Sequence, residues 1–169
     1  YDVTFYDIDL NLDPDKKNIG GKVAIHFRAL KKLKTIRIDL YNNLHINSLE
    51  LSGKEIPYIR NDRAVIANLP DNLVIGRDYI LMVAYEGKPK SAKNPPWSGG
   101  MVWGKDKVGN PWIGVTCETE GGSIWFPCKD HLSDEPDSVR LRLSVPAGLQ
   151  VVSNGLMENH TSKSGKETF

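Results

Sequence analysis

Several features that would assign a protein to a class at once are scarce in these 169 residues. There are only two cysteines, too few for the disulfide framework of a small secreted domain. No apolar run approaches the roughly 20 residues that a helix needs to cross a bilayer, so no transmembrane segment is expected. Neither sign of charge dominates, with 22 Lys and Arg against 21 Asp and Glu, and this balance gives no general attraction for nucleic acid.

The signatures of common catalytic sites are missing as well. The sequence contains no H-E-x-x-H, the helix motif that holds zinc and supplies a general base. No glycine-rich phosphate loop follows a predicted strand, and no Ser-His-Asp arrangement is suggested. The chain taken by itself is therefore predicted to be catalytically inactive.

Composition leaves the compartment open. Cytoplasmic and periplasmic or secreted locations both fit, because two cysteines do not fix the redox environment. The chain opens on Tyr1 rather than Met, as it would after removal of a leader, and we favour an extracytoplasmic location.

What the sequence does contain is a series of short segments in which apolar and polar residues alternate, the pattern of half-buried strands. The first two, 1–12 and 22–30, flank a turn rich in Pro, Asp and Asn and predict a long antiparallel hairpin. Further strands are predicted at 34–41, 46–51, 56–60, 64–69, 77–85, 138–145 and 149–153. No window shows a helical period, so the sequence predicts a single, mostly antiparallel all-β domain over residues 1–169.

Two stretches interrupt the strands. Residues 87–111 carry Pro95-Pro96 and Gly99-Gly100 and are predicted to form a long loop, because such residues are excluded from central strands. Residues 109–138 hold both cysteines and a high density of acids and glycines, and are the first candidate for a functional site.

A metal site within this second stretch is not expected. Cys117 and Cys128 with His131 have the spacing C-x10-C-x2-H, which is not that of a zinc ribbon, and no fourth ligand is evident. Buried free cysteines are the favoured interpretation, because free Cys packs like a small hydrophobic residue. A Cys117–Cys128 disulfide stays open for an oxidising compartment.

The order of several motifs resembles a known family. The opening YDVTFYDIDLNLDPDKKNIGGKVAIHF is followed by GKP, PPWSGGMVW, PWIGVTCETEG, WFPCKDHLSDEPDS, SVP and VVSNG. This order resembles the amino-terminal domain of the zinc aminopeptidases, the family of aminopeptidase N and leukotriene hydrolase. The resemblance implies a saddle-shaped β-domain that packs on a zinc-binding catalytic domain absent from this chain. It also implies that the longer parent protein removes amino-terminal residues from peptides.

The resemblance places one functional residue in this chain. A Gln or Glu of the family reaches the active-site cleft and binds the free α-amino group of the substrate, and the matching position is Glu118. Thr116, Cys117, Gly121 and Gly122 are the supporting residues, with Thr116 standing where the family has Gln. A carboxylate suits an ammonium group in a partly dry cleft, because such a charge-assisted bond is about twice as strong as a neutral one. The blander interpretation is that Glu118 and Glu120 are ordinary solvated acids near the end of a strand.

Some signals compete with this interpretation. Gly155–Asn159 is similar to the Gly-Ala-Met-Glu-Asn signature of these aminopeptidases, but it follows a first-domain motif, so we interpret the likeness as a coincidence.

The tryptophans Trp97, Trp103 and Trp112 would form a sugar-stacking platform if exposed, or core and domain-interface anchors if buried. The resemblance favours burial. The alternative function is a stand-alone β-sandwich module that binds carbohydrate or a protein partner.

Overall fold

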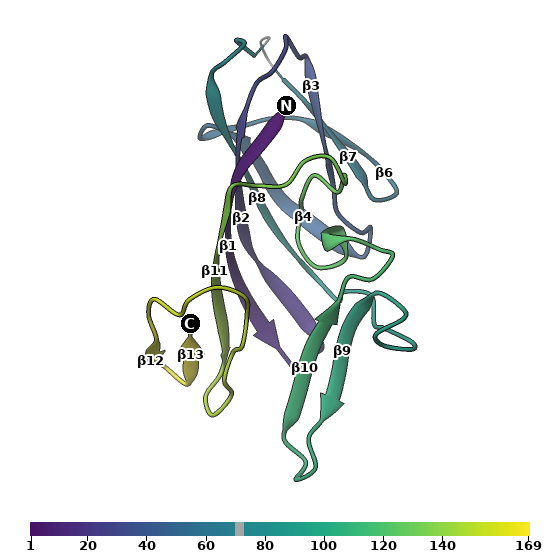
Figure 1. Cartoon of the computed structure of the whole chain (residues 1–169), viewed down its shortest axis with the longest axis vertical. Coiled ribbons are helices and arrows are strands. Elements are labelled where there is room, and N and C mark those ends of the chain that lie inside the picture. The colour runs from purple at the N-terminus through teal and green to yellow at the C-terminus, as the bar shows by residue number, and fades with distance from the viewer. Residues whose placement is uncertain (70–72) are drawn as a thin grey trace.

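The computed structural model describes residues 1–69 and 73–169, and this part of the chain is built almost entirely of β-strands (Figure 1). A large eight-stranded sheet has the order β12-β13-β11-β1-β2-β8-β4-β5. Its strands are β1 (Asp2–Asp13), β2 (Asn18–Arg28), β4 (Leu44–Leu51), β5 (Lys54–Glu55), β8 (Asp78–Gly87), β11 (Ser138–Pro146), β12 (Thr161–Lys163) and β13 (Lys166–Thr168). Every neighbouring pair in this sheet is antiparallel except β1 and β11, which run parallel. The prediction of a mostly antiparallel all-β fold is confirmed.

The predicted hairpin forms the centre of the large sheet. Strands β1 and β2 pair along their whole length, from Asp2 opposite Arg28 to Asp13 opposite Asn18. Because side chains alternate between the two faces of a strand, Ile8 and Leu10 are buried while Asp7 and Asp9 lie on the other face. There Asp7 and Asp9 form ion pairs with Arg140 and Arg142 of β11.

A smaller sheet packs on the large one and completes the core. It has the order β3-β7-β6, with β3 at Thr35–Asp39, β6 at Tyr58–Asn61 and β7 at Ala64–Asn68. The buried residues of β3 and β7 join one cluster with those of the large sheet: Ile36, Ile38, Val65 and Ala67 with Val23, Ile25, Phe27, Leu81, Val83 and Tyr85. Each sheet thus covers the apolar face of the other, which is the arrangement of a β-sandwich.

Two predictions about strands were wrong. Within the stretch taken for a loop, β9 (Gly100–Lys105) pairs with β10 (Pro111–Thr116) as a separate two-stranded hairpin. Glycine weakens central strands, but a two-stranded hairpin has no central strand. Gly100 is required for a different reason: it lies so close to the backbone of Lys90 and Ser91 that a side chain would not fit. Residues 149–153 form no strand, because the chain leaves the sheet through a turn in which the Leu149 N–H donates to the Pro146 carbonyl.

The segment between β10 and β11 crosses from the hairpin to the small sheet, as Figure 1 shows in green. Two backbone hydrogen bonds join Asp39 of β3 to Cys128, with N···O distances of 2.7 and 3.1 Å. The Tyr41 N–H donates to the Ser123 carbonyl at 2.9 Å, and the buried Tyr85 donates its hydroxyl to the Trp125 carbonyl at 2.6 Å. This long connection is therefore held firmly against the core.

Strand β8 offers a direct test of this core. Leu81 is fully buried and its neighbour Ile80 is 39% exposed on the opposite face. Leu81→Ala is expected to lower the free energy of unfolding by about 2–5 kcal/mol, because it leaves a cavity between the sheets. Ile80→Ala, the matched control on the same strand, should cost less than about 1 kcal/mol. Urea unfolding of both variants checks this, and equal losses would contradict the assignment of the two faces.

Candidate functional site

The candidate site is a tight turn that begins where β10 ends. The N–H groups of Glu120 and Gly121 both donate to the Cys117 carbonyl, at 3.1 and 3.0 Å, and close a loop around Glu118 and Thr119. Thr119 has φ 61° and Gly121 has φ 80°, so the backbone takes a positive φ twice within three residues. A single 3-10 turn, η1 (Gly122–Ile124), follows directly.

Glu118 lies within this turn and is exposed. Among the residues that the structure describes, none forms a hydrogen bond or an ion pair with its carboxylate. A carboxylate in this state is free to accept hydrogen bonds from a cationic group brought from outside. The role of Glu118 in binding an amine stays a prediction.

Glu120, two residues further on, is in the opposite situation. Its carboxylate accepts hydrogen bonds from the Lys90 ammonium and from the Tyr41 hydroxyl, one on each oxygen. These bonds, first from Lys90 and then from Tyr41, lower the pKa of Glu120, so its charge persists and is largely neutralised by Lys90. Sequence reasoning missed this pairing because the partners lie 30 and 79 residues away in the chain.

The predicted supporting residues fix the base of the turn. Thr116 donates its hydroxyl to the Ser98 carbonyl at 2.9 Å and ties β10 to the segment before β9. Gly121 lies against the Asp130 carboxylate, whose oxygens would be 2.0–2.1 Å from an added Cβ, so any other residue would collide there. Asp130 also accepts a hydrogen bond from the Ser123 hydroxyl at 2.7 Å. A Cβ added at Gly122 would likewise lie only 2.8 Å from the Phe126 ring.

The two cysteines differ from each other. Both thiols are free, Cys128 is buried as predicted, and Cys117 is exposed, so the prediction of burial was wrong for Cys117. Cys117 ends up at the surface because it opens the exposed turn, whereas Cys128 pairs with β3 in the core. Burial raises the pKa of Cys128 far above that of a free thiol. Partial desolvation of the Cys117 sulfur raises the pKa of Cys117 as well.

The residues that the structure describes contain no group of three or more His, Cys, Asp or Glu side chains placed to hold a metal ion. The His131 ring instead bonds to Ser133 through Nδ1, at 2.8 Å from the hydroxyl. That this chain carries no metal stays a prediction, which metal analysis of the purified protein tests.

Of the three tryptophans predicted to be core or domain-interface anchors, only Trp103 is partly buried within this chain. Trp97 and Trp112 are 74% and 67% exposed, so neither packs into the core of this chain. Trp103 does pack against the core from β9. Trp112 alternates with Ile113 on β10, and since Ile113 packs against the core, Trp112 lies on the opposite face of the strand. Trp97 lies in the loop before β9.

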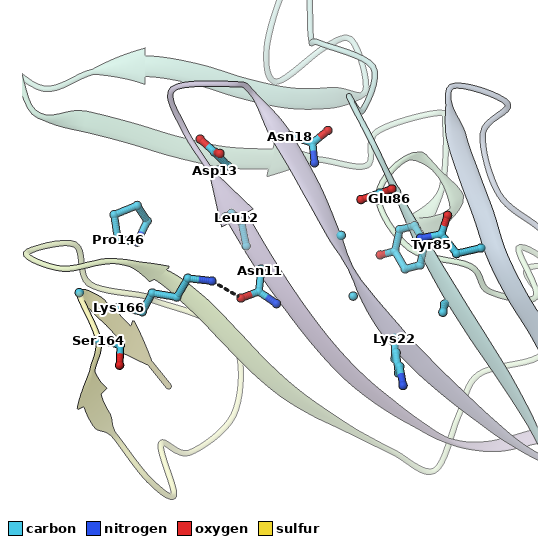
Figure 2. Close-up of a pocket in the computed structure, with 15 residues that line it drawn as sticks. Asn11, Leu12, Asp13, Asn18, Lys22, Tyr85, Glu86, Pro146, Ser164 and Lys166 are labelled. Atoms are coloured by element: carbon cyan, nitrogen blue, oxygen red, sulfur yellow. Dashed lines mark hydrogen bonds between the residues drawn. The ribbon is translucent and has the colours of Figure 1, made fainter.

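The surface of the described residues has two hollows that could hold a ligand or a partner. Figure 2 shows a groove on the outer face of β1, β2 and β8, whose lining includes Asn11, Leu12, Lys22, Tyr85 and Glu86. It contains none of the predicted site residues. The second hollow, here called the apolar groove, lies between β10 and β11. Its lining includes Leu10, Leu12, Ile113, Val115, Leu141 and Leu143, and also Leu156 and Met157 from the segment that resembles the Gly-Ala-Met-Glu-Asn signature.

No protein-family model and no curated protein sequence matches this chain. Solved structures do. A mutant of a two-domain M1 zinc metallopeptidase bound to L-arginine matches 99% of the chain with TM-score 0.80 and 26% identity. An M1 zinc metallopeptidase from Deinococcus radiodurans matches 99% of it with TM-score 0.81 and 24% identity. Yeast LTA4 hydrolase in complex with bestatin matches 99% with TM-score 0.71 and 18% identity.

These matches confirm the predicted resemblance to the amino-terminal domain of M1 zinc metallopeptidases. The chain spans 38% of the two-domain metallopeptidase, 37% of the Deinococcus radiodurans protein and 26% of yeast LTA4 hydrolase. The described residues contain no helix long and apolar enough to cross a membrane.

Thiol chemistry separates the two cysteines. In the native state a small alkylating reagent is expected to modify Cys117 and to spare Cys128 until the protein unfolds. Because only the thiolate reacts, the rate of alkylation of Cys117 should increase about tenfold per pH unit. Because the pKa of Cys117 is raised, this increase should continue beyond about pH 8.5, the pKa of a free cysteine. Mass spectrometry of the modified protein, with Cys117→Ser as the control, gives the readout. Native-state reaction at Cys128, or none at either thiol, would contradict the structure.

Proposed function

We propose that this chain is the amino-terminal domain of a zinc-dependent aminopeptidase and that Glu118 binds the free α-amino group of the peptide substrate. The observation that carries the proposal is the free carboxylate of Glu118 on a firmly held turn, in a fold matched over 99% of the chain by M1 zinc metallopeptidases. The described residues do not fit a zinc site, so the zinc would be bound by a catalytic domain outside residues 1–169. When bound there, zinc would activate the water that attacks the first peptide bond.

The two acids of the turn divide the chemistry between them. An ammonium group gains most from a carboxylate whose charge is not already compensated, because it then forms a charge-assisted bond that no internal partner must give up. Glu118 meets this condition, while Glu120 is already bonded to Lys90 and Tyr41. A peptide blocked at its amino terminus lacks the charge and would lose this contact. Selection for a free amino terminus follows from Glu118.

The apolar groove supports the proposed docking of the catalytic domain. Val115 and Val139 in its lining are 42% and 51% exposed, and Leu156 and Met157 are 94% and 75% exposed. A concentration of exposed apolar side chains of this kind marks an interaction surface. We propose that the catalytic domain of the same chain covers this face and that the Cys117–Gly121 turn then forms one wall of the cleft.

A stand-alone module that binds carbohydrate is the second candidate, because Trp97 and Trp112 are exposed as a sugar-stacking platform requires. The coding sequence beyond residue 169 separates the two candidates. The aminopeptidase proposal predicts an H-E-x-x-H motif with a downstream Glu in the same reading frame. A natural stop directly after Phe169, together with binding of glycans by the isolated chain, would favour the module.

The amine-binding role is tested by Glu118→Ala in the full-length protein. Loss of one charge-assisted bond is expected to cost about 1.5–3 kcal/mol of substrate binding, which is a fall of roughly tenfold or more in kcat/KM for peptides with a free amino terminus. Glu55→Ala serves as the matched control, because Glu55 is also exposed but lies on the edge strand β5. Unchanged kinetics for Glu118→Ala, or an equal loss in the control, would contradict the proposed role.

A further inference from the structure

Between the two acids of the turn, Thr119 holds a conformation that its side chain disfavours. Its φ of 61° lies in the left-handed region, which a β-branched residue rarely adopts. A strained residue of this kind persists only when the surrounding structure fixes it from several sides. The turn therefore needs contacts beyond its own two backbone hydrogen bonds to the Cys117 carbonyl.

The Glu120 side chain supplies these contacts. It joins the turn to Tyr41, which follows β3, and to Lys90, which lies between β8 and β9. The fit is close, because the Glu120 side chain lies directly over Gly99, where an added Cβ would come within 2.4 Å of it. Glu120 thus connects three separate parts of the chain at one point.

Both partners of Glu120 are themselves immobilised. Arg60 donates hydrogen bonds to the carbonyls of Leu40, Tyr41 and Leu44 and so fixes the backbone that carries Tyr41. The Lys90 carbonyl accepts a hydrogen bond from the Met101 N–H at 2.7 Å, which fixes Lys90 against β9. The contacts of Glu120 therefore lead back to the small sheet on one side and to the hairpin on the other.

We propose that Glu120 is a positioning residue: its bonds to Tyr41 and Lys90 hold the strained turn and thereby fix the Glu118 carboxylate for the substrate amine. This inference rests on the proposed function. Without the bonds, Thr119 relaxes to a commoner conformation and Glu118 points correctly for only part of the time. The apparent affinity for the amine then falls by the fraction of molecules in the competent conformation.

Glu120 is not itself a suitable ligand for the amine. Each of its carboxylate oxygens already accepts a hydrogen bond, and the Lys90 ammonium already compensates its charge, so a further ammonium would gain less there than at Glu118. The bonds from Lys90 and Tyr41 also keep the pKa of Glu120 low, so its carboxylate stays ionised over the neutral range. Its effect on the substrate is therefore exerted through Glu118.

The experiment is a double-mutant cycle in the full-length protein, with Glu118→Ala, Glu120→Ala and the double variant assayed on a peptide with a free amino terminus. Glu120→Ala is expected to raise KM three- to tenfold with kcat nearly unchanged, because the amine contact is the same in the ground state and the transition state. In the Glu118→Ala background the same change should alter KM less than twofold. Tyr41→Phe, which removes only the hydroxyl, should act in the same direction and serves if Glu120→Ala does not fold.

A rescue variant separates positioning from a general loss of structure. Asn adopts the left-handed conformation more readily than Thr, so Thr119→Asn added to Glu120→Ala should recover much of the lost affinity, whereas Thr119→Val, which keeps the β-branch, should not. Equal effects of Glu120→Ala with and without Glu118 would overturn the inference, and so would an unchanged KM in both Glu120→Ala and Tyr41→Phe. If Glu118→Ala itself has no effect, the proposed function fails instead, so the two failures are distinguishable.

Discussion

The backbone bridge between Asp39 and Cys128 is the constraint on which the candidate site depends. Its two hydrogen bonds, at 2.7 and 3.1 Å, tie a long irregular connection to the edge of the small sheet. The connection could otherwise move, because loops make few buried contacts of their own. With Cys128 fixed, Ser123 reaches Tyr41 and Asp130 fills the space beside Gly121. The turn that presents Glu118 is thus built on the core, although its own residues are at the surface.

The two acids of the turn are neighbours in the chain but lie in different surroundings. Glu120 is compensated by Lys90 and belongs to the scaffold, while Glu118 faces solvent. Thr119 connects the two acids in a left-handed conformation, which directs their side chains into different surroundings. Strain concentrated next to an uncompensated charge is typical of a functional site. This juxtaposition supports the proposed role of Glu118 more strongly than its exposure alone.

The fold was largely predictable from the sequence, and the site only in part. Alternation in the segments of β1, β2 and β11 predicts the strands and their buried faces, because a half-buried sheet imposes period two on its sequence. The β9–β10 hairpin was missed, because its glycines argue against a central strand. In a two-stranded sheet neither strand is central, so that argument does not apply. The hydrogen bonds of Glu120 with Tyr41 and Lys90 could not be predicted, because the tertiary fold brings these residues together and no local pattern marks them. The exposure of Cys117 and Trp97 likewise depends on where the chain turns away from the core.

The central claim is that the Cys117–Gly121 turn holds Glu118 for the amino terminus of a peptide beside a zinc ion outside this chain. A crystal structure of the full-length protein with a bound dipeptide tests it most directly. The account predicts the Glu118 carboxylate within hydrogen-bond distance of the dipeptide amine, about 2.7–2.9 Å for a charge-assisted contact. It also predicts that Glu120 keeps its bonds to Tyr41 and Lys90 in that complex. A dipeptide amine bound only by residues outside this chain, with Glu118 facing bulk solvent, would contradict it.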